Sequence, residues 1–128
     1  MPRKTNWTDK ERQAVYDKYN GHCAYCGKSI KLKSCKNSER MYIDHIVPVI
    51  LEEYDGVPVN NDLENLNPAC FFCNFYKSTY SLEDFRKNIE ETCVKRLEKI
   101  FNFKLLVRFG IIKVVRKPVK FYFEKEEE

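Results

Sequence analysis

The alternation of apolar and polar positions is clearest between residues 82 and 109. Apolar residues recur there mostly at steps of three and four, the spacing of one face of an α-helix. They are Leu82, Phe85, Ile89, Val94, Leu97, Ile100 and Phe101. Gly110 follows them, and glycine is typical of a helix end. The pattern therefore predicts a helix over about 82–109.

A second helix is predicted near the N-terminus. Thr8-Asp9-Lys10-Glu11 has the Ser/Thr-x-x-Glu form of a capping box, in which two side chains satisfy backbone N–H groups at a helix start. Val15 and Tyr19 share one face of this helix, and Gly21 suits its end.

Shorter elements are predicted elsewhere. Residues 41–47 are apolar and β-branched and stop at Pro48, which indicates a strand, and a second strand is expected from Glu64 to Asn67. Residues 51–62 contain turn formers and indicate a loop. Phe71 to Lys77 fits two turns of helix. Residues 111–115 and 119–123 are interpreted as a C-terminal β-hairpin around Lys117-Pro118.

These elements predict an α+β fold in one domain over residues 1–128. Its core would span about 20–80, with the helix at about 82–109 and the C-terminal strands at about 111–123.

Composition adds an expected compartment. The 128 residues are 43% hydrophobic and 33% charged, an ordinary globular mixture. No apolar run approaches the ~20 residues that cross a bilayer, and the polar start predicts no export signal. We therefore expect a cytoplasmic protein, in which cysteines are metal ligands or free thiols rather than a disulfide framework.

The charges are segregated along the chain. Residues 1–40 carry a net charge of +6, residues 41–65 carry −6 with no Lys or Arg, and residues 66–123 carry +7. Two basic flanks around an acidic centre suit a protein that binds a polyanion and holds a divalent cation between them. A well-solvated surface is the alternative, and charge alone favours it.

Four of the six cysteines form two identical pairs, Cys23-x-x-Cys26 and Cys70-x-x-Cys73. Two intervening residues let both thiolates reach one cation at about 2.3 Å, and two such pairs complete a tetrahedron around zinc. A closed four-sulfur site has no open position, so the predicted zinc is structural. The alternative is two unrelated pairs, one of them redox-active.

The motif between and after these pairs resembles a known family. Asp44-His45-Ile46-Val47-Pro48, Asn65-Leu66 and Cys73-Asn74-x-x-Lys77 are similar to the signature of HNH (ββα-metal) endonucleases, with asparagine in the third place. The flanking cysteine pairs add to the resemblance, which covers about residues 8–90. It implies a small ββα-metal core with a four-cysteine zinc site, like that of phage or mobile-element nucleases and compact restriction enzymes. It also implies that Asn65 ties a loop to the active-site strand.

The side chains suit phosphodiester hydrolysis, which needs an activated water and a cation at the phosphate. His45 can act as general base near neutral pH. Asp44 and Asn74 offer only oxygen ligands, a set that favours Mg²⁺, with Mn²⁺ able to replace it. On a regular strand Asp44 and His45 point to opposite faces, so the strand must end or twist there.

Asn74 and Lys77 are three residues apart and share a helix face, from which Lys77 could stabilise phosphate charge. The aromatic residues of this helix are then expected to pack inward on the other side; they are Phe71, Phe72, Phe75 and Tyr76. Tyr25, in the first cysteine pair, is a candidate for nucleic-acid contact. The basic residues expected on the phosphate backbone are Lys113, Arg116, Lys117 and Lys120.

The leading hypothesis is an endonuclease that nicks or cuts double-stranded DNA, the DNA preference being implied by the resemblance. Because one active site cuts one strand, a double-strand cut needs a homodimer or two encounters. Separately, His45 could be a satisfied core histidine, Asn65 a turn residue, Asn74 a helix cap and Lys77 a solvated lysine. Two further hypotheses are a non-catalytic zinc module that binds nucleic acid or a protein, and a cysteine-based redox protein.

Overall fold

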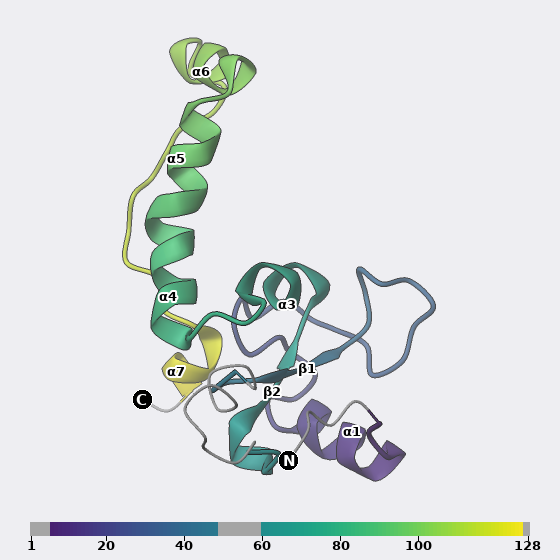
Figure 1. Cartoon of the computed structure of the whole chain (residues 1–128). Coiled ribbons are helices and arrows are strands. Elements are labelled where there is room, and N and C mark those ends of the chain that lie inside the picture. The colour runs from purple at the N-terminus through teal and green to yellow at the C-terminus, as the bar shows by residue number, and fades with distance from the viewer. Residues whose placement is uncertain (1–5, 49–59, 127–128) are drawn as a thin grey trace. The chain divides into compact units, whose positions relative to one another are not determined.

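The computed structural model describes residues 6–48 and 60–126, which fall into two compact units. Unit 1 comprises residues 1–82 and 121–128, and unit 2 comprises residues 83–120 (Figure 1). Most of the predicted loop 51–62 lies outside the described residues. That the whole chain is a single nuclease domain stays a prediction.

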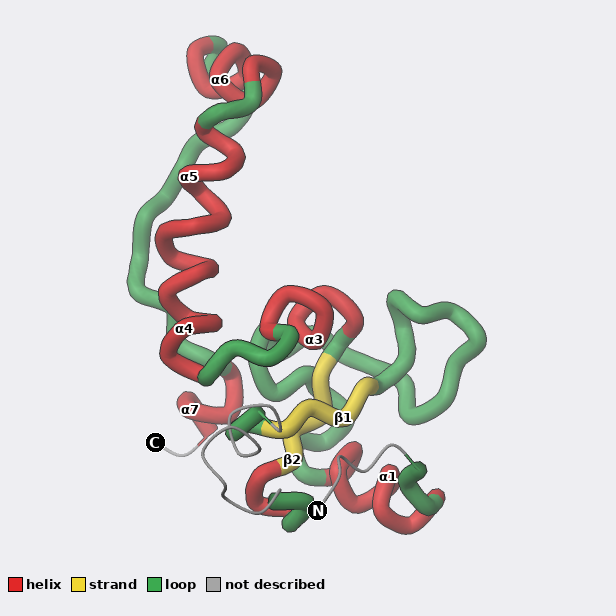
Figure 2. The backbone as a smooth tube through the Cα atoms, in the orientation of Figure 1, coloured by secondary structure: helices red, strands yellow, loops and turns green. Residues whose placement is uncertain are grey.

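Unit 1 contains a two-stranded antiparallel sheet made of β1 (Tyr42–His45) and β2 (Leu66–Ala69), drawn in yellow in Figure 2. Tyr42 is paired with Ala69 and His45 with Leu66. β1 confirms the first predicted strand with tighter bounds. β2 begins two residues later than expected, because a 3₁₀ turn, η1 (Leu63–Asn65), occupies the predicted start.

The helices of unit 1 cover this sheet. α3 (Phe71–Lys77) packs on β1 and has the predicted bounds, and α1 (Asp9–Asp17) packs on β2. The predicted capping box is confirmed at the start of α1. The Thr8 hydroxyl oxygen accepts from the Glu11 N–H at 3.1 Å, and the Glu11 carboxylate accepts from the Thr8 N–H at 3.0 Å. A turn after Asp17 carries the chain to Gly21.

The C-terminal residues of unit 1 complete its core instead of forming a hairpin. Phe121 and Phe123 are buried, and both rings meet the ring of Tyr25 edge-on, at 5.3 and 5.9 Å. The Phe123 N–H donates to the Ala24 carbonyl at 2.8 Å, and α7 (Tyr122–Glu126) ends the described chain. The predicted C-terminal strands are therefore wrong. Lys117-Pro118 lacks the residues of a tight hairpin turn, and burial of the two phenylalanines takes the place of strand pairing.

Unit 2 is mainly helical. α4 (Leu82–Lys87), the π-helical turn η2 (Asn88–Thr92) and α5 (Cys93–Glu98) follow one another directly, and α6 (Phe101–Arg108) comes after a break. The predicted helix over 82–109 is confirmed apart from this break at Ile100, whose backbone is extended with ψ 125°. The apolar spacing continues through the break, so spacing alone predicts one helix.

The segment after α6 lies along the earlier helices of unit 2 without forming a strand in its described residues. Arg86 donates to the Val119 carbonyl and Glu90 accepts from the Val119 N–H, both at 2.7 Å. No helix among the described residues is long and apolar enough to span a membrane.

Candidate metal and catalytic site

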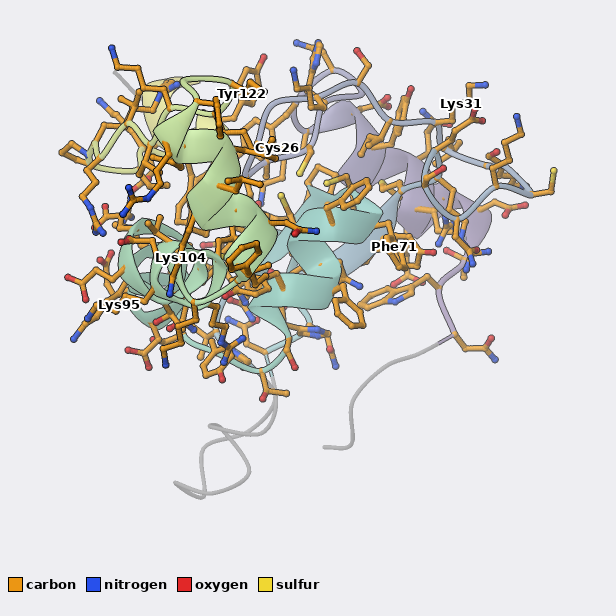
Figure 3. All side chains as sticks on the ribbon, turned by 90° about the horizontal axis from the view of Figure 1, so that it is seen from above. Cys26, Lys31, Phe71, Lys95, Lys104 and Tyr122 are labelled. Atoms are coloured by element: carbon orange, nitrogen blue, oxygen red, sulfur yellow. The ribbon has the colours of Figure 1, made fainter. Side chains whose placement is uncertain are left out.

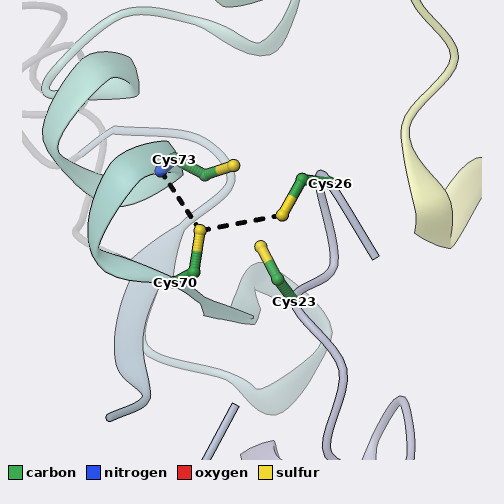
Figure 4. A group of neighbouring side chains, drawn as sticks. All are labelled: Cys23, Cys26, Cys70 and Cys73. Atoms are coloured by element: carbon green, nitrogen blue, oxygen red, sulfur yellow. Dashed lines mark hydrogen bonds between the residues drawn. The ribbon is translucent and has the colours of Figure 1, made fainter. Parts of the chain in front are cut away.

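The four predicted zinc ligands come together in unit 1. The Sγ atoms of Cys23, Cys26, Cys70 and Cys73 all lie within 4.8 Å of one another (Figure 4). Gly27 has φ +78°, which allows the tight turn after the first pair, and α3 begins between Cys70 and Cys73. Among the described residues, these four cysteines are the group of His, Cys, Asp or Glu side chains placed closely enough to bind one metal ion.

The geometry of the cluster fits a zinc ion. Ligands at about 2.3 Å on a tetrahedron place sulfurs about 3.8 Å apart, and the Sγ atoms of Cys26 and Cys70 are 3.7 Å apart. The Cys73 N–H donates to the Cys70 sulfur at 3.4 Å. The neighbouring thiols, that of Cys23 first, hold the pKa of Cys26 well below its usual value. By their positions, the four cysteines could hold a zinc ion.

Asp44, near the end of β1, lies in a buried polar cluster about Lys77. The Tyr25 hydroxyl donates to Oδ2 of Asp44. The Lys77 amine lies 3.3 Å from Oδ1 and 3.2 Å from Oδ2, and it also donates to the His45 carbonyl at 3.0 Å. Burial raises the pKa of Asp44, while the Lys77 charge opposes that rise. Burial lowers the pKa of Lys77, because it disfavours the charged form of the amine as it does that of the carboxylate.

This cluster corrects one expectation and bears on another. Tyr25 is only 3% exposed, so it is not placed to meet nucleic acid. The Lys77 side chain is fully buried against Asp44, and its contribution to catalysis stays a prediction. Both side chains instead satisfy the carboxylate of Asp44, which would be costly to bury without partners. A cluster of this kind fixes the carboxylate in one orientation.

The Lys77–Asp44 pair makes a testable contribution to stability. Lys77→Met should lower the free energy of unfolding by about 3–5 kcal/mol, because it leaves a buried carboxylate without its cation. Urea denaturation measures the change, with Lys36→Met as a control for losing an exposed lysine. Equal stability of the two variants would show that the buried pair contributes nothing.

His45 ends β1 and is held by two residues outside the predicted motif. Its Nε2 lies 2.8 Å from Oδ1 of Asn61, and its ring centroid is 6.1 Å from that of Trp7, tilted by 44°. The side chains of Asp44 and His45 are both buried and have different hydrogen-bond partners. Lys77 links these two residues, because its amine donates to the Asp44 carboxylate and to the His45 backbone carbonyl.

Asn65 joins the start of β2 to the segment that follows β1. It is buried, its Oδ1 accepts from the Val47 N–H at 2.9 Å, and its Nδ2 donates to the Asn60 carbonyl at 2.9 Å. Its own carbonyl accepts from the Ile46 N–H at 2.8 Å. These contacts tie the chain on both sides of the loop, and loop-tying is the role that the resemblance implies for Asn65.

Asn74 is half-buried on α3, the helix that packs on β1. The phenylalanines of this helix do not pack inward as expected, since Phe72 is 70% and Phe75 is 74% exposed. α3 turns Lys77 toward Asp44, and the rings cover one another on the outer side. Phe71, which is labelled in Figure 3, stacks on Phe75 at 5.9 Å and also meets Tyr42 at 6.1 Å.

Comparison with known proteins agrees with this geometry. The family model described as HNH endonuclease matches residues 23–79, which include both cysteine pairs, Asp44, His45 and Asn74. Residues 23–79 are therefore similar to the HNH endonuclease family.

A curated relative bears the same family name. The chain is 28% identical over 88 residues to the Bacillus subtilis (strain 168) protein named "SPbeta prophage-derived putative HNH endonuclease YoqL". The match covers 65% of this chain and 34% of the relative, so the chain spans about a third of that protein's length. No solved structure matches the chain.

Three residues around the HNH motif were not predicted to contact its side chains. Trp7 and Asn61 contact His45, and Tyr25 bonds Asp44. Asn61 follows His45 by 16 residues, at the end of a stretch rich in turn formers. Tyr25 lies between two zinc-ligand candidates, and nothing local in the sequence marks it as a partner of a carboxylate.

Proposed function

We propose that the protein is a metal-dependent endonuclease that hydrolyses phosphodiester bonds in DNA. The observation that supports this most is the end of β1, where an oriented histidine follows a fixed carboxylate within the HNH segment. A histidine of the protein core would need neither this neighbour nor the family's surrounding motif.

His45 acts as the general base in this proposal. Its Nε2 carries the ring proton and donates a hydrogen bond to Oδ1 of Asn61, since a carbonyl-type oxygen can only accept. Nδ1 then has the lone pair that takes a proton from the attacking water. Asn61 and Trp7 are positioning residues, because they restrict the orientation of the ring.

Asp44 and Asn74 are the proposed ligands of the catalytic cation, Mg²⁺ or Mn²⁺. Their carboxylate and amide oxygens suit a hard cation, and among the described residues Oδ1 of Asp44 has Lys77 as its hydrogen-bond partner, leaving acceptor capacity. When bound, such a cation neutralises charge on the scissile phosphate and on the leaving oxygen. Lys77 and Tyr25 hold the Asp44 carboxylate in place, which assigns Lys77 a positioning role.

The cysteine cluster is proposed to hold a structural zinc that fixes α3. Cys70 and Cys73 belong to the first turn of this helix, and Asn74 and Lys77 follow on its next turn. Zinc bound to all four sulfurs would anchor the helix to the Cys23–Cys26 turn. The position of both catalytic-site residues on α3 would then depend on that metal.

Double-stranded DNA, nicked by one protein or cut by a homodimer, is the proposed substrate. The prophage origin in the relative's name is compatible with a phage-type nuclease. The basic segment with Lys113, Lys117 and Lys120 is exposed in unit 2 and is proposed to contact phosphates. Its fourth member, Arg116, forms an ion pair with Glu98 at 2.6 Å.

Supercoiled plasmid tests this function. Zinc-loaded protein, dialysed free of other divalent ions, should convert plasmid to the nicked form when Mg²⁺ or Mn²⁺ is added and should be inactive without them. Asn74→Ala should require more Mg²⁺ for half-maximal rate, because one ligand is lost. Protein that contains its zinc but nicks with neither metal would favour a non-catalytic zinc module.

A further inference from the structure

A groove of about 370 Å³ lies beside the proposed catalytic histidine in unit 1. Its lining includes two aromatic residues, Trp7 and Tyr42, and three cationic ones, Arg12, Lys33 and Arg40. No Asp or Glu lines it within the described part of the chain. A cavity of this size is at the lower end of small-molecule sites, which suits one nucleotide and not a larger ligand.

The aromatic lining offers faces on which a base can stack. Trp7 and Tyr42 are half-buried, so part of each side chain stays accessible. The Trp7 ring contacts His45 at 6.1 Å, and the Tyr42 ring contacts Phe71 at 6.1 Å. Stacking on such rings is how many proteins bind unpaired bases without sequence preference.

The cations of the groove are arranged to meet a phosphate. Arg12 is anchored through its donation to the Leu32 carbonyl at 3.1 Å. Lys33 has one weak, exposed ion pair with Asp9 at 3.5 Å, which a phosphate can replace at little cost. The Arg40 guanidinium lies 4.9 Å over the Tyr42 ring. Charge and a stacking face therefore occur together at Arg40.

We propose that this groove binds one unpaired nucleotide of the substrate strand, with its base stacked on the aromatic lining and its phosphate held by Arg40 and Lys33. The inference rests on the proposed function, since contact between Trp7 and His45 places the groove next to the reacting centre. Bases within an intact duplex present only their edges. Within the double-stranded DNA proposed as substrate, the preferred cleavage site is therefore one at which a strand is locally unpaired.

Trp7 is the sole tryptophan of the chain, so its fluorescence reports on the groove directly. The zinc-loaded protein of residues 1–128, without added Mg²⁺, is titrated with oligodeoxythymidylate of about eight nucleotides, within the usual range of single-strand sites. We expect saturable quenching. A blunt-ended duplex at equal phosphate concentration should quench Trp7 much less.

Arg40→Gln should raise the Kd for the oligonucleotide about fivefold, because it removes a phosphate contact and a stacking cation. Lys36→Gln removes the same charge from an exposed position of the neighbouring segment that does not line the groove, and it should change Kd less than about twofold. Both residues are exposed, so circular dichroism should show an unchanged fold.

Absent quenching, equal quenching by duplex, or equal effects of Arg40→Gln and Lys36→Gln would overturn the groove assignment. Because the titration needs no cleavage, the two proposals fail separately. Quenching by protein that never nicks plasmid would refute the nuclease and leave the groove. Nicking by protein that shows no quenching would refute the groove and leave the nuclease proposal standing.

Discussion

His45→Ala is expected to lower the single-turnover rate of Mg²⁺-dependent plasmid nicking by about 10²–10⁴-fold, the usual contribution of a general base. The variant loses the imidazole that Asn61 and Trp7 orient at the end of β1. It retains Asp44 with its Tyr25 and Lys77 contacts, which involve only the backbone of residue 45. Substrate binding should therefore change little, and gel quantification of nicked plasmid measures the loss.

The other histidine of the chain provides the matched control for this loss. His22 lies outside the proposed site, with its Nδ1 donating to the Gly27 carbonyl at 3.1 Å. His22→Ala should nick at close to the wild-type rate, and both variants should have wild-type circular dichroism and zinc content. Equal loss in the two variants would attribute the effect to folding and not to catalysis.

Cys70→Ser is expected to abolish zinc binding and to unfold the protein. Zinc held by four thiolates contributes on the order of 10 kcal/mol, which is comparable to the whole stability of a small domain. The hydroxyl of serine is a poor replacement for a thiolate at a zinc-type site. Because Cys70 is also the N-cap of α3, the helix that carries Asn74 and Lys77 should lose its position.

Metal analysis and thermal melting followed by circular dichroism measure this effect. Cys35→Ser makes the same atomic change at an exposed cysteine outside the cluster and should leave zinc content and melting temperature unchanged. A Cys70→Ser protein that melts like the Cys35→Ser control would show that the cluster does not stabilise the fold.

Local signals in the sequence predicted the elements that depend on local chemistry. The Thr8–Glu11 capping box sets the start of α1 through contacts three residues apart. The two cysteine pairs come together as their spacing predicts, and the bounds of α3 follow from the helical segment after Cys70. Each of these features is encoded within a few residues or by a shared metal geometry.

Features that depend on distant partners were not predictable in the same way. Residue spacing shows that Asn74 and Lys77 share a face of α3. It does not show that Lys77 forms an ion pair with Asp44 on β1. Because α3 turns Lys77 inward to reach Asp44, the side chains of Phe72 and Phe75 are exposed to solvent. Likewise, Phe121 and Phe123 alternate as strand residues do, yet they are buried against Tyr25, nearly one hundred residues earlier.

The Asn61 contact has the same origin. Asparagine in a turn-rich stretch usually satisfies local backbone groups, as Asn60 does by accepting from the Asp62 N–H at 2.9 Å. Its neighbour Asn61 instead bonds an imidazole 16 residues away. Only the arrangement of the chain on both sides of Asn65 brings these two side chains together.

Chemical rescue of His45→Ala by imidazole tests the central claim most directly. Nicking of supercoiled plasmid in Mg²⁺ should rise with the concentration of added imidazole for His45→Ala and should not change for the wild type. A free base then replaces the missing side chain in the space beside Asn61 and Trp7. A His45→Ala protein that nicks at the wild-type rate without imidazole would contradict the assignment of His45 as the base.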